Sequence, residues 1–168
     1  MQKLVLVCAS CGVGKSSVIE YINKIKPSLN FIFTEADKLG LNCWDYVNNN
    51  ERSYYEDCLI KVFEIAEDKN VLYASCINPI EYSEKVKRIP EVKTYFISLT
   101  CSDEEIRRRL LARPKERMCD SEEFIQSQIT YNNWFKNNLD KFDLYLDTST
   151  QSIEETVKSI ISFVSKLD

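Results

Sequence analysis

Short apolar runs alternate along the chain with segments in which apolar residues recur every three or four positions. The runs have the length and continuous hydrophobicity of buried strands, and the periodic segments have the spacing of amphipathic helices. We predict strands over residues 4–8, 31–34, 71–75, 92–99 and 142–146. We predict helices over residues 15–25, about 54–68, a short stretch after 79, 102 to about 112, 121–137 and 153–167.

This alternation of strands and helices predicts an α/β fold. Strands that are apolar throughout are typical of a parallel sheet with helices on both faces. The chain has 168 residues, which suits one domain with a sizeable core. It contains no internal repeat, low-complexity segment or Gly/Ser linker, so we predict a single domain over residues 1–168.

The amino-acid composition argues against some partners, such as long nucleic acids and anionic membranes, and indicates where the protein is located. Hydrophobic residues make up 44% and charged residues 29%, as in an ordinary globular protein, and the formal net charge is −4. A sequence pI of about 5.1 provides no basic field that would recruit long nucleic acids or an anionic membrane. No apolar run approaches the roughly 18 residues of a membrane span. The first residues run directly into a strand, and we expect a cytoplasmic protein.

The cysteines also favour a reducing compartment. There are seven, an odd number scattered along the chain, which is unlike a secreted disulfide scaffold. Cys8 and Cys11 form a C-x-x-C motif. A redox pair or a metal site is one interpretation, but a zinc site needs further clustered ligands. We favour two incidental thiols.

The chain contains no histidine. This excludes a Ser-His-Asp triad, a Cys-His pair and any histidine general base. Acid–base chemistry must therefore come from carboxylates, lysine, tyrosine or cysteine.

Two of the three glycines, Gly12 and Gly14, lie in the stretch VCASCGVGKSS directly after the first predicted strand. The stretch satisfies the phosphate-binding pattern G-x-x-x-x-G-K-[ST], except that Ala9 occupies the position of the first glycine. Its setting, after a strand and at the start of a helix, is the one the pattern requires. A glycine-containing turn with a solvated lysine is the alternative; we predict a nucleoside triphosphate site.

The chemistry of such a loop assigns roles to its residues. The backbone N–H groups of residues 11–16 would surround an anion at the positive end of the helix. Lys15 would neutralise the β- and γ-phosphates, and the Ser16 hydroxyl would ligate Mg²⁺. The predicted nucleotide-binding residues of the loop are Ser10, Cys11, Gly12, Val13, Gly14, Lys15, Ser16 and Ser17.

With this loop the chain resembles, over essentially its full length, small P-loop kinases of the nucleoside, nucleotide and gluconate kinase type. The chloramphenicol phosphotransferase-like and polynucleotide kinase-like branches are included. The resemblance implies a P-loop NTPase three-layer sandwich with five parallel strands and a short lid. It also implies ATP with Mg²⁺ and transfer of the γ-phosphoryl group to a small acceptor. The closing segment LDTSTQSIEETVKSI resembles the family's last strand and helix, which would place Asp147, Thr148 and Ser149 beside the adenine.

The stretch ISLTCSDEEIRRRLLARPKER resembles the helix that leads into the lid of these kinases. Phosphoryl transfer needs cations on the transferred group. Arg109, Arg113 and Arg117 recur every four residues and would share one face if the helix ran on, whereas Pro114 predicts its end and a hinge. We assign Arg113 and Arg117 to catalysis, Arg109 to nucleotide binding, and about 113–130 to the lid.

A solvated basic face is the alternative for this arginine-rich stretch. Its arginines would then pair with Glu104 and Glu105. We prefer that interpretation for Arg107 and Arg108. Ser102 and Glu105 also form the S-x-x-E pattern of a helix capping box.

On the acceptor side, Glu35 and Asp37 follow the second predicted strand and would point the same way if the chain were still extended. Ligands of α/β sheets bind beyond the carboxyl ends of strands. A carboxylate there can take the proton of an attacking hydroxyl. In related kinases that act on alcohols an acid at this point does so, and Asp37 is the better match, with Glu35 as substitute. A helix cap or a solvated loop acid is the alternative.

Residues from about 38 to 70 would hold the acceptor. The segment LGLNCWDYVNNNERSYY could stack on a base or sugar and hydrogen-bond to it, or could simply cover the edge of the sheet. We leave both open. The residues concerned are Trp44, Tyr46, Arg52, Tyr54, Tyr55 and the asparagines between them.

Two departures from related enzymes limit the assignment. The third strand ends in Ser75-Cys76, where many P-loop enzymes carry an Asp that supports Mg²⁺, so metal support shifts to Ser16, Asp37 or Glu35. The chain also lacks the Asp-Gly-aromatic-Pro-Arg motif of adenylate kinases, which argues against that activity.

We therefore predict an ATP- and Mg²⁺-dependent phosphotransferase that acts on a nucleoside or nucleotide. A kinase of a sugar acid, an antibiotic or a polynucleotide end is the alternative within the same chemistry. A nucleotide-dependent switch without an acceptor is the alternative from another class.

Overall fold

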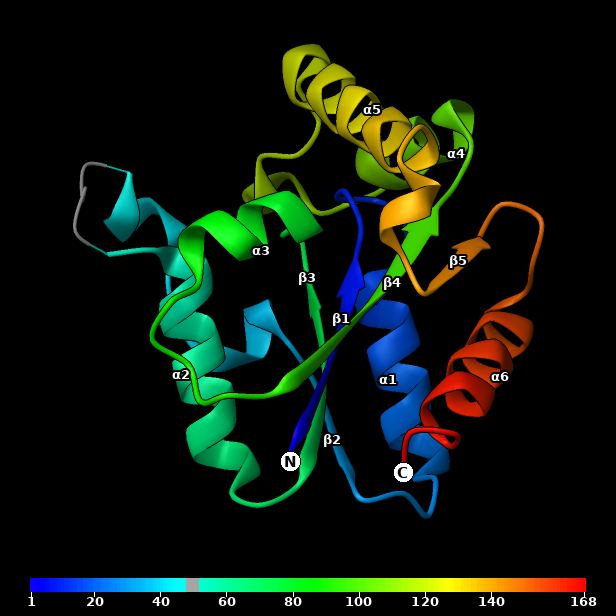
Figure 1. Ribbon diagram of the computed structural model, residues 1–168. Coiled ribbons are helices and arrows are strands. Elements are labelled where there is room, and N and C mark those ends of the chain that lie inside the picture. The colour runs from blue at the N-terminus through cyan, green and yellow to red at the C-terminus, as the bar shows by residue number, and fades with distance from the viewer. Residues whose placement is uncertain (48–51) are drawn as a thin grey trace.

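The structure is a computed structural model that describes residues 1–47 and 52–168. Five parallel strands form one sheet in the order β2-β3-β1-β4-β5, so β1 lies at its centre (Figure 1). The strands are β1 (Lys3–Cys8), β2 (Phe31–Glu35), β3 (Asn70–Ser75), β4 (Lys93–Thr100) and β5 (Leu144–Asp147). This central position of β1 places the loop that follows it in the middle of the carboxyl edge of the sheet.

Helices cover both faces of the sheet and its carboxyl edge. Helices α1 and α6 lie on one face and α2 and α3 on the other, whereas α4 and α5 lie beyond the strand ends (Figure 1). The helices are α1 (Lys15–Ile25), α2 (Tyr54–Ala66), α3 (Pro79–Lys85), α4 (Asp103–Leu111), α5 (Glu122–Lys136) and α6 (Ile153–Val164). The predicted three-layer α/β sandwich is confirmed.

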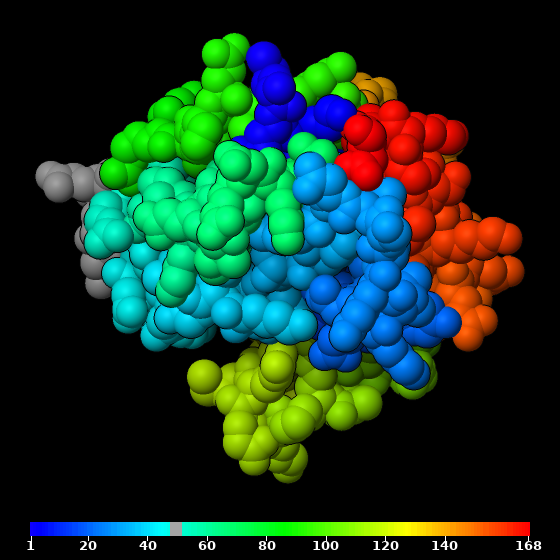
Figure 2. Space-filling view, turned by 90° about the horizontal axis from the view of Figure 1, so that it is seen from below, coloured from blue at the N-terminus to red at the C-terminus, as the bar shows by residue number. Residues whose placement is uncertain are grey.

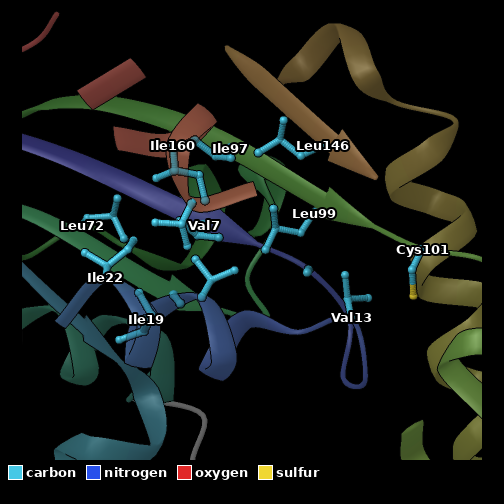
Figure 3. Packing of buried hydrophobic residues seen from close by; sticks show 14 of the residues in the cluster. Val7, Val13, Ile19, Ile22, Leu72, Ile97, Leu99, Cys101, Leu146 and Ile160 are labelled. Carbon is cyan, nitrogen blue, oxygen red and sulfur yellow. The ribbon is translucent and has the colours of Figure 1, made fainter. Parts of the chain in front are cut away.

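The two faces of β1 explain why the chain folds in this way. Successive side chains of a strand point to opposite faces. Val5 and Val7 pack with α1 and α6, and Figure 3 shows Val7 beside Ile22 and Ile160. Leu4 and Leu6 pack on the other side against α2. From Leu4 to Cys8 the strand is apolar and buried, as expected for a strand that is covered on both faces.

The two ends of the chain lie at the amino ends of the strands, and Figure 2 shows them side by side. Lys3 Nζ donates a hydrogen bond to the carbonyl of Leu167, and the Asn30 N–H donates to the Asp168 carboxylate. The yellow-green segment around the start of α5 projects from the body of the molecule in the same view. The chain ends thus occupy the amino edge of the sheet, and a ligand site is expected at the opposite, carboxyl edge. The segment after α4 extends from that carboxyl edge.

Several details of the prediction need correction. At the start of α4, Ser102 accepts the N–H of Glu105, but the Glu105 side chain turns to Arg108 and Arg109 and does not complete a capping box. The sequence pattern also missed four short 3₁₀ helices: η1 (Ala36–Leu39), η2 (Cys43–Tyr46), η3 (Lys115–Arg117) and η4 (Leu139–Lys141). Among residues 1–47 and 52–168, no helix is both long and apolar enough to cross a membrane.

Candidate active site

The loop between β1 and α1 has the backbone shape that its glycines predict. Gly12 has φ 88° and Gly14 has φ 115°, conformations that residues with a side chain rarely adopt. A Cβ atom on Gly12 would also lie 3.1 Å from Leu110 Cγ of α4. Gly14 is the residue before α1, and no side chain among residues 1–47 and 52–168 caps the helix, so its first N–H groups are left for another partner.

Lys15 folds back over this loop. Its Nζ donates to the carbonyl oxygens of Ala9 at 2.9 Å and Ser10 at 2.8 Å. Ser10 is fully buried, and within the described part of the chain its Oγ has no hydrogen-bond partner. The loop thus holds a cation and an unsatisfied hydroxyl next to free helix N–H groups, an arrangement suited to an anionic ligand.

Ser16 lies in the first turn of α1 and contacts the end of β2. Its Oγ donates a 2.5 Å hydrogen bond to Glu35 Oε2. The Glu35 side chain is buried, and its other oxygen lies 3.8 Å from Lys38 Nζ. The hydroxyl that the loop pattern assigns to a metal therefore lies directly beside a carboxylate.

A cavity of about 80 Å³ opens between the loop and the carboxyl ends of β2 and β3. It contains both predicted acceptor-side carboxylates, the loop lysine and one lid arginine. The residues that line it are Cys11, Gly12, Gly14, Lys15, Ser16, Glu35, Ala36, Asp37, Ala74, Ser75, Cys76 and Arg113. The elements that sequence analysis assigned to phosphate and acceptor thus meet at one place.

Glu35 and Asp37 do not share an extended segment, contrary to the premise of the prediction. Strand β2 ends at Glu35, and the 3₁₀ helix η1 begins at Ala36. The chain turns between them, so Glu35 points into the sheet edge at Ser16 and Asp37 remains 64% exposed. Both still line the cavity, but in different settings.

Arg113 and Arg117, the two arginines predicted for the lid, lie on a segment that follows α4. Helix α4 ends at Leu111, before Pro114, as the proline predicts. Arg113 lines the cavity, and Arg117 Nη1 lies 3.5 Å from Asp37 Oδ2. The Asp37–Arg117 pair is exposed on both sides and therefore contributes little to stability. It shows that the segment after α4 reaches the end of β2.

Arg109 and Thr148 meet at the opposite end of the loop. Arg109 Nη1 donates to the Val13 carbonyl at 2.7 Å and to Thr148 Oγ1 at 3.2 Å. Both residues line a second cavity, of about 250 Å³, together with Gly14, Ser17 and the start of α6. This cavity adjoins the loop on the side where the resemblance places adenine. Asp147 and Ser149 hydrogen-bond to each other instead and do not line it.

The remaining arginines of α4 have acidic partners. Arg108 pairs with Glu105, as predicted for a solvated face, whereas Arg107 pairs with Glu122 of α5. Glu105 also forms an ion pair with Arg109, whose Nε lies 2.6 Å from Glu105 Oε1. Hydrogen bonds from Arg108 and Arg109 lower the pKa of Glu105 to about 2, so its carboxylate keeps Arg109 oriented at neutral pH.

Cys8 and Cys11 are not a thiol pair. Cys8 is the last residue of β1 and is buried, which raises the pKa of its thiol. The Sγ atom of Cys11 instead lies 3.9 Å from that of Cys76, directly after β3. All seven cysteines are free, and no cluster of three or more metal-binding side chains occurs within the described ranges.

Sequence analysis missed two residues of α5 that support the site. Gln128 Oε1 accepts the N–H of Cys11 at 2.9 Å, and the Tyr131 hydroxyl donates to the carbonyl of Cys76 at 2.6 Å. They lie three residues apart and therefore on one face of α5. No local pattern identifies them, because the contacts arise only when α5 packs across the sheet edge.

The aromatic segment lies around a separate, open cavity of about 630 Å³, with α3 and the loop after it on the other side. Tyr46 and Tyr54 pack edge to face, with ring centroids 5.5 Å apart, and Arg52 pairs with Asp57. The Trp44 side chain is exposed and does not line this cavity. Neither alternative for this segment is decided, and the asparagines 48–50 lie outside the described residues.

Comparison with solved structures shows the same fold in a gluconokinase, a shikimate kinase and a tunicamycin resistance protein. A gluconokinase from Sinorhizobium meliloti 1021 matches with a TM-score of 0.63 at 19% identity, covering 98% of this chain and 93% of that one. A shikimate kinase from Acinetobacter baumannii, in complex with shikimate, has a TM-score of 0.62 at 16% identity, covering 100% and 95%. A tunicamycin resistance protein from Deinococcus radiodurans has a TM-score of 0.66 at 11% identity, covering 98% and 96%.

These likenesses define the class: the chain has the P-loop kinase fold. A family model described as an AAA domain matches residues 5–130, and the chain belongs to that family. The match begins in β1 and includes the loop after it, Asp37, Arg113 and Arg117, but ends before Tyr131 and Thr148. No curated protein matches the chain.

Proposed function

We propose that the protein transfers the γ-phosphoryl group of ATP to a hydroxyl group of a small acceptor. The observation that carries the proposal is the cavity in which Lys15, Asp37 and Arg113 meet. It combines a cation for the phosphates, an accessible carboxylate for the acceptor and a lid arginine for the transferred group. Residues 38–70 would hold the acceptor and residues 113–130 would form the lid.

The acceptor class follows from the setting of Asp37. A phosphate acceptor is already ionised and needs no base, whereas a hydroxyl needs one. An exposed carboxylate in the cavity therefore favours a nucleoside or another small alcohol over a nucleotide phosphate. The names of the gluconokinase and the shikimate kinase agree with an alcohol acceptor. We place the reaction in the cytoplasm, where ATP is available and free thiols persist.

The residues present suit Mg²⁺. Ser16 Oγ and Glu35 Oε2 lie 2.5 Å apart at the cavity, and neutral and anionic oxygens are the ligands that this hard cation takes. Ser16 would hold the metal directly, and Glu35 would bind it or orient its water. When bound, Mg²⁺ neutralises the charge of the β- and γ-phosphates.

The reaction then assigns a task to each side chain. The α1 N-terminus and the loop N–H groups bind the phosphates, and Lys15 leaves its two carbonyl partners to contact them. Asp37 leaves Arg117, orients the acceptor hydroxyl and takes its proton as the oxygen attacks phosphorus. Arg113 and Arg117 stabilise the charge on the transferred group. Arg109 and Thr148 hold the nucleoside end of ATP.

Glu35→Gln should raise the Mg²⁺ concentration needed for half-maximal activity, because the carboxylate beside Ser16 is lost. Ser16→Ala should do the same and should affect metal-free ADP binding less. Titration of activity with Mg²⁺ and calorimetry of ADP without metal measure the two effects. Glu20→Gln, an exposed change on α1 outside the cavity, is the control. An unchanged Mg²⁺ requirement in both site variants would rule out the metal role.

Arg113→Ala and Arg117→Ala should lower kcat more than they raise KM for ATP, since their charge acts mainly in the transition state. Steady-state kinetics of each variant measures the difference. Arg107→Ala is the matched control, because that arginine pairs with Glu122 outside the cavity. If all three variants turn over at the parental rate, Arg113 and Arg117 belong to a solvent-exposed basic face and have no role in catalysis.

The proposed function itself is tested by ADP formation with separate pools of nucleosides, nucleotides, sugar acids and aminoglycoside-type alcohols. We expect one hydroxyl pool to stimulate ADP formation above the rate with ATP alone. Equal, slow rates in every pool would indicate a nucleotide-dependent switch in place of a kinase.

A further inference from the structure

Two thiols face each other across the phosphate-binding cavity. Cys11 belongs to the loop after β1 and Cys76 follows β3, yet their Sγ atoms are 3.9 Å apart. Both residues line the cavity and both are partly accessible. A disulfide has an S–S distance of about 2.05 Å, so a displacement of about 2 Å would join them.

Helix α5 fixes this juxtaposition from outside the cavity. Gln128 accepts a hydrogen bond from the backbone N–H of Cys11, and the Tyr131 hydroxyl donates one to the backbone carbonyl of Cys76. Tyr131 is itself hydrogen-bonded to Asn78 and Glu81. The two thiols therefore meet because both backbones are anchored to one rigid element.

The surroundings make the two sulfurs chemically unequal. A hydrogen bond from the Cys11 thiol and the nearby Lys15 ammonium lower the pKa of Cys76 well below its ordinary value, against the effect of burial. The same hydrogen bond, together with burial, raises the pKa of Cys11. The Lys15 ammonium thus favours the thiolate at Cys76, and the Cys11 sulfur lies 3.9 Å from it.

We propose that Cys11 and Cys76 form an oxidative modification site that reacts with hydrogen peroxide to close a disulfide across the phosphate-binding loop. The Cys76 thiolate attacks one peroxide oxygen and the O–O bond breaks, which gives a sulfenic acid and, with one proton, water. The Cys11 thiol then attacks the Cys76 sulfur and displaces a second water. Two thiols lose two electrons in total, and the peroxide is reduced.

The disulfide would alter the loop in which it forms. Cys11 is adjacent to Gly12, and pulling its sulfur toward Cys76 displaces the N–H groups that face a bound phosphate. Lys15, which lies beside both sulfurs, would lose its thiolate neighbour. This consequence rests on the proposed function: oxidation should lower ATP affinity, and reduction with dithiothreitol should restore it. Bound ATP should in turn slow the oxidation.

The test is to treat the full chain with hydrogen peroxide, alkylate the free thiols and map the peptides by mass spectrometry. We expect one fast disulfide, between Cys11 and Cys76. Cys11→Ser should stop at a sulfenic acid on residue 76 that dimedone traps, and Cys43→Ser, which removes an exposed cysteine, should form the same disulfide as the parent. Overoxidation of Cys76 with Cys11 still free, or a disulfide to another cysteine, would overturn the proposal.

ATP binding of the reduced and oxidised parent, measured by calorimetry, separates this inference from the proposed function. Failure of the reduced protein to bind ATP would refute the proposed function, whereas the peptide map would still decide the modification site. A Cys11–Cys76 disulfide that leaves ATP affinity unchanged would refute the regulatory consequence.

Discussion

Lys15→Met is expected to lower turnover with ATP by at least ~10²-fold while the fold stays intact, because it removes the cation from the β- and γ-phosphates. In the structure Lys15 Nζ donates to the carbonyl oxygens of Ala9 and Ser10 within the loop. Methionine fills a similar volume and cannot donate. Steady-state kinetics with the identified acceptor, and circular dichroism for the fold, measure the two parts of the prediction.

The matched control is Lys24→Met, an exposed lysine in the last turn of the same helix. That variant should keep parental activity. Parental turnover in Lys15→Met would show that the loop does not hold the reacting phosphates, and the assignment of the site would fail with it.

Asp37→Asn is expected to lower phosphoryl transfer to a hydroxyl by roughly 10²–10⁴-fold, the usual contribution of a positioned general base. Asparagine keeps the shape of the side chain and removes its ability to take a proton. ATP binding should survive, since Asp37 lies on the acceptor side of the cavity. Loss of the exposed Arg117 ion pair should change stability little. Single-turnover rates and ATP affinity measure the two effects.

Two further variants make this prediction specific. Asp140→Asn removes an exposed carboxylate that lies 3.7 Å from Lys141 Nζ and outside the cavity, and it should be silent. Glu35→Gln should mainly alter the metal requirement. If Glu35→Gln abolishes transfer at saturating Mg²⁺ while Asp37→Asn does not, the base is Glu35 and the assignment of the two carboxylates is reversed.

The sequence predicts the fold closely because each element carries its own signal. Continuous apolar runs identify the strands and periodic apolar residues the helices, and Gly12 and Gly14 identify the loop by the positive φ that they supply. The end of α4 before Pro114 also follows from a local rule. Each of these features is determined by residues close to it in the sequence, so the sequence alone predicts it.

Contacts between segments that are distant in the sequence could not be predicted from such local signals. The turn of η1 separates Glu35 from Asp37, and no residue between them carries a strong turn signal. The Cys11–Cys76 juxtaposition depends on β1 and β3 being neighbours in the sheet, whereas the sequence pattern showed only the C-x-x-C of Cys8 and Cys11, which we interpreted as two incidental thiols. Gln128 and Tyr131 join the site only through the packing of α5.

The most direct measurement of the central claim is phosphorus NMR of the protein with ATP, Mg²⁺ and the stimulating acceptor. We expect the γ-phosphate signal to be replaced by that of a phosphate monoester on the acceptor, together with ADP, and Lys15→Met to abolish this product. Conversion of ATP to ADP and inorganic phosphate alone, at a rate that the acceptor does not change, would contradict the claim.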